Sequence, residues 1–94
     1  MENISILGST GSIGRQTLDI VRDHRDRLRV IALTANRNIE RLQQQIEEFS
    51  PEFVCVTDER KAKELKRQIG SKVEIYPGVD GLVEAAAHPK ANRG

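Results

Sequence analysis

Short apolar runs rich in β-branched residues alternate along this sequence with longer segments whose apolar residues recur every three or four positions. The first pattern is typical of buried strands and the second of amphipathic helices. Four such pairs follow one another with only a few connecting residues. Strands that alternate with helices of this length form parallel sheets through right-handed crossovers. We therefore predict an α/β fold: a Rossmann-like, doubly wound parallel sheet, present in part as four βα units.

Residues that start or stop regular structure set the limits of these elements. The predicted strands cover residues 3–7, 28–35, 53–56 and 73–76. The first predicted helix carries apolar positions from Ile13 to Val21, and the later helices cover 39–49, 59–69 and 80–87. Asn38 and Asp58 are expected to cap the second and third helices, because their side-chain oxygens accept bonds from first-turn amides.

Composition and charge exclude several classes of protein. Ninety-four residues allow one small domain, and 15 Lys and Arg against 14 Asp and Glu leave a net charge of +1. A nucleic-acid binder usually shows a clear excess of basic residues, which this chain lacks. No apolar run approaches the ~20 residues of a membrane span. One cysteine and two histidines form no zinc pattern. With the first strand starting at the N-terminus, no signal peptide is evident. We expect a cytoplasmic protein without nucleic-acid or membrane partners.

The segment Gly8-Ser9-Thr10-Gly11-Ser12-Ile13-Gly14 lies between the first predicted strand and helix. In this context, glycines let the backbone approach a pyrophosphate, and free amides at the helix start face the anion. The Ser9, Thr10 and Ser12 hydroxyls are expected to add donors. The alternative is a tight turn that needs glycine only for its backbone angles. The order of strand, loop and helix favours phosphate binding.

The end of the second predicted strand carries Asn36-Arg37-Asn38. A site for unphosphorylated NAD usually has an Asp or Glu here to accept from the ribose 2′-hydroxyl. A guanidinium suits a 2′-phosphate instead. The alternative is a surface arginine in a turn. Its position favours a contact between Arg37 and the 2′-phosphate of NADPH.

These residues resemble a known family. The runs 6–14, 17–19 and 29–33 are similar to the start of the 1-deoxy-D-xylulose 5-phosphate reductoisomerases. The likeness continues through Arg37-Asn38, Phe49-Ser50-Pro51 and Gly81-Leu82 to His88-Pro89. The resemblance implies that Thr10, Gly11, Ser12 and Ile13 hold the cofactor phosphates. It implies that Arg37 and Asn38 lie at the adenosine 2′-phosphate, with Asn36 where the family usually has glycine.

The resemblance also implies an activity for the full-length parent. Enzymes of this family isomerise 1-deoxy-D-xylulose 5-phosphate and reduce it with NADPH to 2-C-methyl-D-erythritol 4-phosphate, on the non-mevalonate route to isoprenoids. A divalent metal (Mg or Mn), a sugar-phosphate substrate and a homodimer are implied for that parent.

We expect residues 1–94 to be the N-terminal part of an NADP-binding Rossmann-like domain. The resemblance places the metal ligands, the catalytic residues and the C-terminal domain outside this sequence, so none of the 94 residues is assigned as catalytic or metal-binding. In the doubly wound order the first strand is central, and its second neighbour would come from later sequence. Two alternatives remain: a catalytically inert dinucleotide-binding module, or the first half of another NADP-dependent oxidoreductase.

Other residues with reactive side chains have simpler explanations. Cys55 is expected to be a small buried hydrophobic residue of the third strand. His24 lies in a charged run and is expected to be solvated. Asp19 and Asp23 lie four positions apart on the first helix, where a carboxylate pair is conceivable, but neighbouring arginines favour surface charge.

Overall fold

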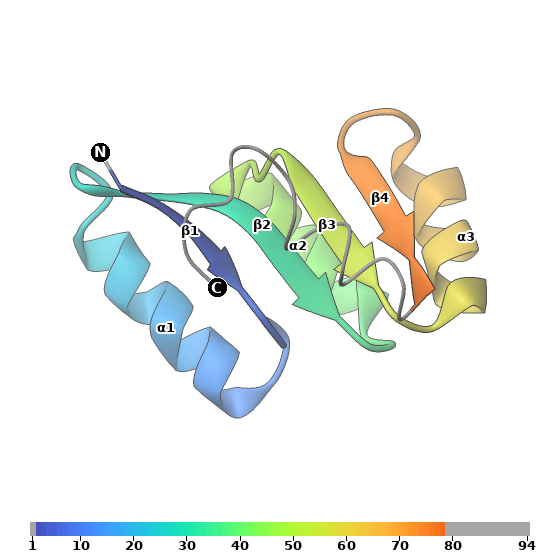
Figure 1. Ribbon diagram of the computed structural model, residues 1–94, viewed down its shortest axis with the longest axis horizontal. Helices are drawn as coiled ribbons and strands as arrows, with labels where there is room; N and C mark the ends of the chain where they lie inside the picture. Colours follow the sequence, from blue (N-terminus) through green and yellow to red (C-terminus); the bar gives the residue numbers. More distant parts are fainter. Residues whose placement is uncertain (1, 79–94) are drawn as a thin grey trace.

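The computed structural model describes residues 2–78 of the 94-residue chain. The elements are β1 (Glu2–Ile6), α1 (Ser12–Asp23), β2 (Leu28–Ala35), α2 (Ile39–Phe49), β3 (Phe53–Val56), α3 (Glu59–Ile69) and β4 (Glu74–Pro77) (Figure 1). The four strands are parallel and ordered β1-β2-β3-β4. This arrangement confirms the predicted α/β class. The helix predicted over 80–87 lies outside the described residues.

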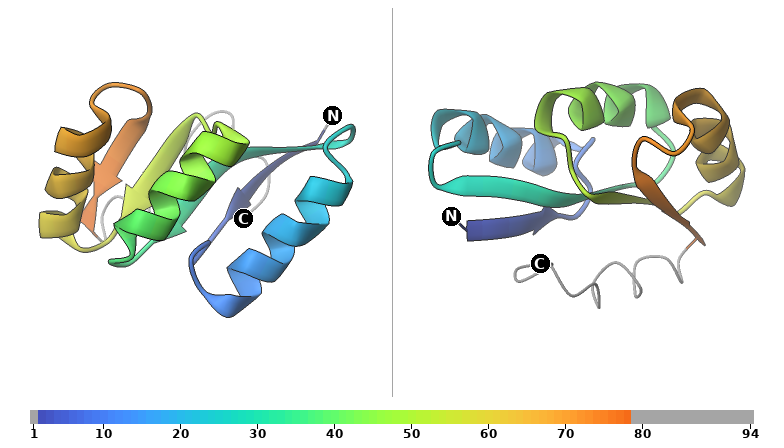
Figure 2. Two further views of the ribbon diagram at one scale, coloured as in Figure 1. Left: turned by 180° about the vertical axis from the view of Figure 1, so that it is seen from behind. Right: turned by 90° about the horizontal axis from the view of Figure 1, so that it is seen from above.

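The three helices among residues 2–78 all lie on one face of the sheet (Figure 2). This follows from the strand order, because right-handed crossovers between successive neighbouring strands place every helix on the same side. The described residues thus form one half of a doubly wound sheet. Within residues 2–78, β1 is an edge strand that pairs only with β2. Its outer side is where the doubly wound order predicts a further strand.

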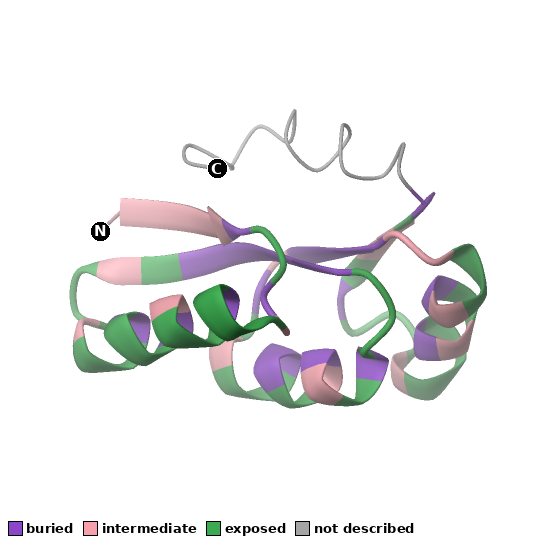
Figure 3. Ribbon diagram, turned by 90° about the horizontal axis from the view of Figure 1, so that it is seen from below, coloured by how far each residue is buried: buried purple, intermediate pink, exposed green. Residues whose placement is uncertain are grey.

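Side chains from both faces of β2 and β3 are buried. The larger cluster lies between the sheet and the helices, and the helix surfaces turned toward the sheet are buried (Figure 3). It includes Leu33 and Val54 from the strands, Leu18 from α1, Leu42 from α2 and Leu65 from α3. A smaller cluster on the other face contains Ile31, Ala32, Phe53 and Cys55. Continuous burial of β2 from Val30 to Ala35 agrees with its nearly unbroken apolar run after Arg29, in which Thr34 is the one polar residue.

The predicted caps of α2 and α3 are confirmed. The Asn38 side chain accepts from the Arg41 amide and the Asp58 side chain accepts from the Lys61 amide, each at 3.1 Å. Ser50, with φ of 49°, ends α2 in the left-handed region before Pro51. None of the helices among residues 2–78 is long and apolar enough to cross a membrane.

The sequence prediction was wrong in detail at β1, α1 and β4. β1 ends at Ile6, and Leu7, expected in a buried strand, is 64% exposed in the following turn. Ile13 and Ile20 share the helical spacing of α1 but are 79% and 57% exposed, because the buried face is formed by Gly14, Leu18 and Val21. β4 covers 74–77, one residue later than predicted.

Candidate functional site

The glycine-rich loop joins β1 to α1, and two of its glycines are required by the fold itself. Gly8 has φ of +67°, in the left-handed region that favours glycine. Its carbonyl accepts from the Gly11 amide at 3.0 Å, which closes the turn. A Cβ at Gly14 would lie 2.3 Å from the Gly8 carbonyl oxygen. The first turn of α1 therefore packs directly on the loop backbone.

Gly11 is different, because neither its conformation nor its neighbours demand glycine. Its φ and ψ are −82° and 175°, and a Cβ there would make ordinary contact with the Gly8 oxygen at 3.4 Å. Gly11 is the N-cap of α1, and no side chain caps this helix. The amides of the first turn are thus left for another acceptor at the positive end of the helix dipole. This is the geometry of an anion site.

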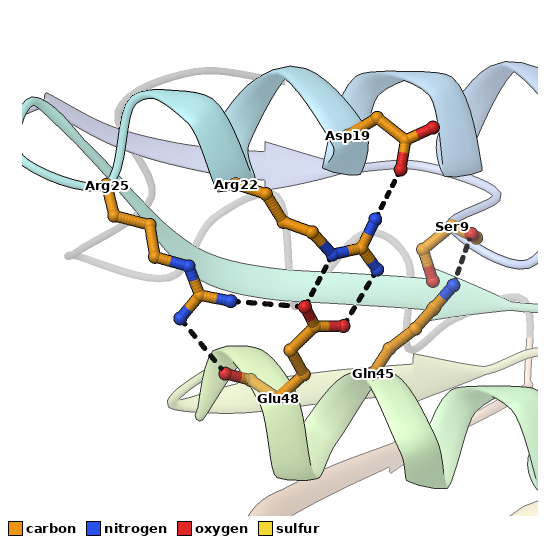
Figure 4. A network of polar contacts seen from close by, with 6 residues as sticks. All are labelled: Ser9, Asp19, Arg22, Arg25, Gln45 and Glu48. Carbon is orange, nitrogen blue, oxygen red and sulfur yellow. Dashed lines mark hydrogen bonds and ion pairs between the residues drawn. The ribbon is translucent and has the colours of Figure 1, made fainter.

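Hydrogen bonds to two buried residues, one from β2 and one from α2, hold the loop in place. The Gly8 amide donates to the Thr34 hydroxyl and the Ser9 amide donates to the Thr34 carbonyl, both at 2.8 Å. From α2, Gln45 Nε2 donates to the Ser9 carbonyl at 2.7 Å (Figure 4). Gln45 is only 5% exposed, and its Oε1 has no partner among the described residues.

Sequence reasoning missed Thr34 and Gln45, although each left a signal. Thr34 is the one polar residue in the apolar run from Val30 to Ala35, and Gln45 shares the inward face of α2 with Leu42 and Ile46. The expectation that Ser9 offers its hydroxyl to the anion was wrong. Ser9 is fully buried, and its Oγ donates to the Thr34 carbonyl at 3.3 Å.

The turn after β2 presents Arg37 to solvent. The Arg37 side chain is 75% exposed, and its Nε donates to Asp58 Oδ2 at 3.1 Å. The Asn36 Oδ1 accepts from the Thr57 hydroxyl at 2.7 Å, and the Asn36 carbonyl accepts from the Asp58 amide at 3.1 Å. The turn is thus joined to the segment that follows β3.

Asp58 is ionised in this arrangement. The Lys61 backbone amide is the strongest influence and lowers the pKa of the Asp58 carboxyl below its ordinary value, and the Arg37 charge lowers it further. The carboxylate therefore serves two partners at neutral pH: the first turn of α3 and the Arg37 guanidinium.

The loop and the turn lie at the same edge of the sheet. Thr34 holds the loop from a position two residues before Asn36, and the carboxyl ends of β1 and β2 are neighbours. In open α/β sheets, ligands bind outside the carboxyl ends of the strands. The structure thus brings the two predicted groups, residues 10–13 and 36–38, to the carboxyl edge of the sheet, where open α/β sheets bind their ligands.

Comparison with known proteins decides the family. The family model of 1-deoxy-D-xylulose 5-phosphate reductoisomerase matches residues 4–93. The chain belongs to this family. This membership removes the alternative of another oxidoreductase family.

Individual relatives agree with that assignment. The chain is 53% identical over 87 residues to the 1-deoxy-D-xylulose 5-phosphate reductoisomerase of Citrifermentans bemidjiense, covering 92% of this chain and 23% of the relative. It is 50% identical over 93 residues to that of Lachnoclostridium phytofermentans, covering 98% of this chain and 24% of the relative. The chain thus spans about a quarter of the length of these curated relatives.

Solved structures show the same fold. The Zymomonas mobilis reductoisomerase in complex with NADPH superposes with a TM-score of 0.86 at 38% identity, covering 95% of this chain and 24% of that one. A reductoisomerase in complex with NADPH, fosmidomycin and magnesium superposes with a TM-score of 0.91 at 32% identity, covering 97% of this chain and 23% of that one.

In this family member, a cluster of charges fastens α1 to α2. Arg22 of α1 and Arg25 of the turn after α1 both bond Glu48 of α2, and Arg22 also pairs with Asp19 (Figure 4). Both guanidinium groups lie over the Phe49 ring, at 5.3 and 4.9 Å from its centroid. The bond from Arg22 lowers the pKa of Glu48. Asp19 thus belongs to a surface ion-pair network, as predicted.

The remaining reactive side chains have structural explanations. Cys55 is fully buried, and burial raises the pKa of its thiol, so the prediction of a buried hydrophobic residue is confirmed. His24 is the half-buried C-cap residue of α1, with its Nδ1 at 3.1 Å from Arg27 Nη2. No group of three or more His, Cys, Asp or Glu residues within 2–78 is arranged to hold a metal.

Proposed function

We propose that this chain forms the phosphate-binding half of the NADPH site of a 1-deoxy-D-xylulose 5-phosphate reductoisomerase. On this proposal, residues 1–94 are the N-terminal part of its NADP-binding domain. The uncapped start of α1 beside Gly11 carries the proposal, because the fold does not require glycine there. A backbone that must approach a pyrophosphate does require it. Solved relatives in complex with NADPH support this interpretation.

The loop residues bind the pyrophosphate on this proposal. The backbone amides of Ser12 and Ile13 face the anion, and Gly11, whose own amide closes the turn on Gly8, lets the backbone come close to it. The Thr10 and Ser12 hydroxyls are available as further donors. The bonds from Thr34 and Gln45 keep the loop in one conformation, so little ordering is needed when the nucleotide binds. NADPH supplies the hydride when bound, and this part of the chain binds and orients the NADPH molecule.

The turn residues recognise the adenosine 2′-phosphate. Arg37 supplies the positive charge, and its terminal nitrogens have no hydrogen-bond partner among residues 2–78. The Asn38 oxygen caps α2, which leaves its side-chain amide to donate to the phosphate. The Asn36 side-chain oxygen accepts from Thr57 in the same way, which leaves the Asn36 side-chain amide as a further donor.

The full-length parent is proposed to convert 1-deoxy-D-xylulose 5-phosphate to 2-C-methyl-D-erythritol 4-phosphate as a cytoplasmic homodimer. Solved relatives are described with magnesium. Within residues 2–78 no carboxylate cluster suits such an ion. We therefore assign the metal ligands to the part of the full-length enzyme that these residues do not cover. The 94-residue chain alone is expected to be inactive. Metal-dependent oxidation of NADPH with this sugar phosphate by the purified chain would contradict that expectation.

Titration of NADPH and NADH against two variants tests the proposed site. Arg37→Ala removes a charge-assisted bond worth about 1.5–3 kcal/mol, so NADPH affinity should fall roughly 10–150-fold while NADH affinity stays nearly constant. Gly11→Val should weaken both nucleotides, because it obstructs the pyrophosphate that they share. Equal losses of NADH and NADPH affinity in Arg37→Ala would show that Arg37 is structural.

A further inference from the structure

We propose that Asp58 is a positioning residue that sets the preference of this site for a 2′-phosphorylated nucleotide, by holding the Arg37 guanidinium through its Nε. The inference rests on the proposed role of Arg37 at the 2′-phosphate. It adds a residue from the end of β3 to a specificity site otherwise formed by the turn after β2.

The two oxygens of the Asp58 carboxylate have separate tasks. Oδ1 accepts from the Lys61 amide at 3.1 Å and caps α3, while Oδ2 accepts from Arg37 Nε at 3.1 Å. The Asp58 side chain is 24% exposed, against 75% for Arg37, so the capped carboxylate is the fixed member of the pair. The bond to Asp58 uses Nε, and the terminal nitrogens of the guanidinium have no hydrogen-bond partner among residues 2–78, so an approaching phosphate can bind them.

The backbone of the two segments keeps this pair in register. The Asp58 amide donates to the Asn36 carbonyl at 3.1 Å, and the Thr57 hydroxyl donates to Asn36 Oδ1 at 2.7 Å. Asp58 is thus bonded both to the side chain of Arg37 and to the backbone immediately before it. Arg37 and its acceptor therefore move together with the sheet edge.

The negative charge of Asp58 does not cancel the attraction of Arg37 for a phosphate. The Lys61 amide and the positive end of the α3 dipole offset part of that charge, and the same amide keeps the pKa of Asp58 low. What the carboxylate adds is order, because an exposed arginine otherwise loses rotamer freedom when it binds the phosphate. Immobilising one long side chain in advance corresponds to about a 2–10-fold gain in affinity.

Asp58→Asn separates the two tasks of the carboxylate. Asparagine is as good a helix cap as aspartate, so the Lys61 amide keeps its acceptor. The second oxygen becomes an NH₂ group, which opposes Arg37 Nε instead of accepting from it. Asp58→Ser is a second variant, because serine also caps a helix but is too short to hold Arg37. Glu64→Gln, which removes a carboxylate from α3 outside the turn, is the charge-matched control.

The experiment is calorimetric titration of NADPH and NADH against the wild-type chain, these three variants, Arg37→Ala and the double variant Arg37→Ala/Asp58→Asn. We expect Asp58→Asn and Asp58→Ser to lower NADPH affinity about 2–10-fold and to leave NADH affinity unchanged. Glu64→Gln should leave the affinity for both nucleotides unchanged. In the Arg37→Ala background, Asp58→Asn should cause no further loss.

Three results would overturn the inference: unchanged or higher NADPH affinity in Asp58→Asn, equal losses for both nucleotides, or the same loss with and without Arg37. If Arg37→Ala itself leaves the ratio of NADPH to NADH affinity unchanged, the proposed 2′-phosphate site fails and the inference fails with it. If Arg37→Ala weakens NADPH selectively but Asp58→Asn has no effect, the inference about Asp58 is refuted and the proposed 2′-phosphate site stands.

Discussion

The glycine-rich loop after β1 and the turn after β2 lie at the same edge of the sheet, but they are held in different ways. The loop is fixed mainly by hydrogen bonds to buried residues: Ser9 is fully buried, and Thr34 and Gln45 are 4% and 5% exposed. The turn is fixed mainly by exposed side chains, and Arg37 is 75% exposed.

This difference separates affinity from selectivity. A buried group left without its partner costs about 1–3 kcal/mol, whereas an exposed ion pair contributes about 0–1 kcal/mol. Changes in the loop should therefore disturb folding and weaken every dinucleotide alike. Changes in the turn should alter the choice between NADPH and NADH at little cost to folding. The four predictions below test that division, from the largest expected effect to the smallest.

Gly14→Ala should have the largest effect, because its Cβ would lie 2.3 Å from the Gly8 carbonyl oxygen and 2.6 Å from the Ser9 Cα. Both neighbours are backbone, so the helix and loop must separate, at a cost of about 3 kcal/mol or more. The check is urea unfolding followed by circular dichroism. Gly11→Ala is the matched control. Replacing this N-cap glycine by alanine should reduce the free energy of unfolding by no more than about 1 kcal/mol. Similar losses for the two variants would contradict the described packing.

Thr34→Val and Thr57→Val apply one chemical change to the two regions. Thr34→Val removes the acceptor of the Gly8 amide and should reduce the free energy of unfolding by about 1–2 kcal/mol. Thr57→Val removes an exposed bond to Asn36 and should cost less than about 0.5 kcal/mol. The same unfolding measurement compares them. A larger loss for Thr57→Val would reverse the proposed difference between loop and turn.

Gln45→Leu should change binding more than stability. It removes the donor to the Ser9 carbonyl but also removes the buried Oε1 that lacks a partner, so unfolding should change by less than about 1 kcal/mol. The loop should lose its fixed conformation, which should weaken NADPH and NADH to the same extent. Calorimetric titration of both nucleotides measures this. A selective loss of NADPH affinity would place Gln45 with the turn.

Acid should weaken the turn before it affects the loop. The pKa of Asp58 is lowered from 3.8 by folding, so its stabilising contribution is present above that value and is lost as the pH falls through the lower folded pKa. The small difference in unfolding free energy between wild type and Asp58→Asn should therefore shrink below about pH 4. The difference between wild type and Gln45→Leu should not, because amide and carbonyl groups do not titrate there. Urea unfolding across this pH range measures both differences.

Local sequence patterns determined most of the fold. β2 and β3 have the predicted bounds, and α2 and α3 begin after the predicted caps Asn38 and Asp58. These succeeded because caps, breakers and apolar runs act over a few residues. The patterns also placed Thr10–Ile13 and Asn36–Asn38 after strands, and parallel strands bring such segments to one edge.

What the tertiary structure alone decided concerns partners that are distant in sequence. The apolar spacing of α1 does not distinguish Leu18, which is buried, from Ile13 and Ile20, which are exposed, because burial depends on which face meets the sheet. The inward-turned hydroxyl of Ser9 depends on Thr34, 25 residues away. The pairing of Arg37 with Asp58 depends on the register of β2 and β3. Sequence periodicity reports the local backbone, whereas hydrogen bonds between elements form only once the sheet has brought them together.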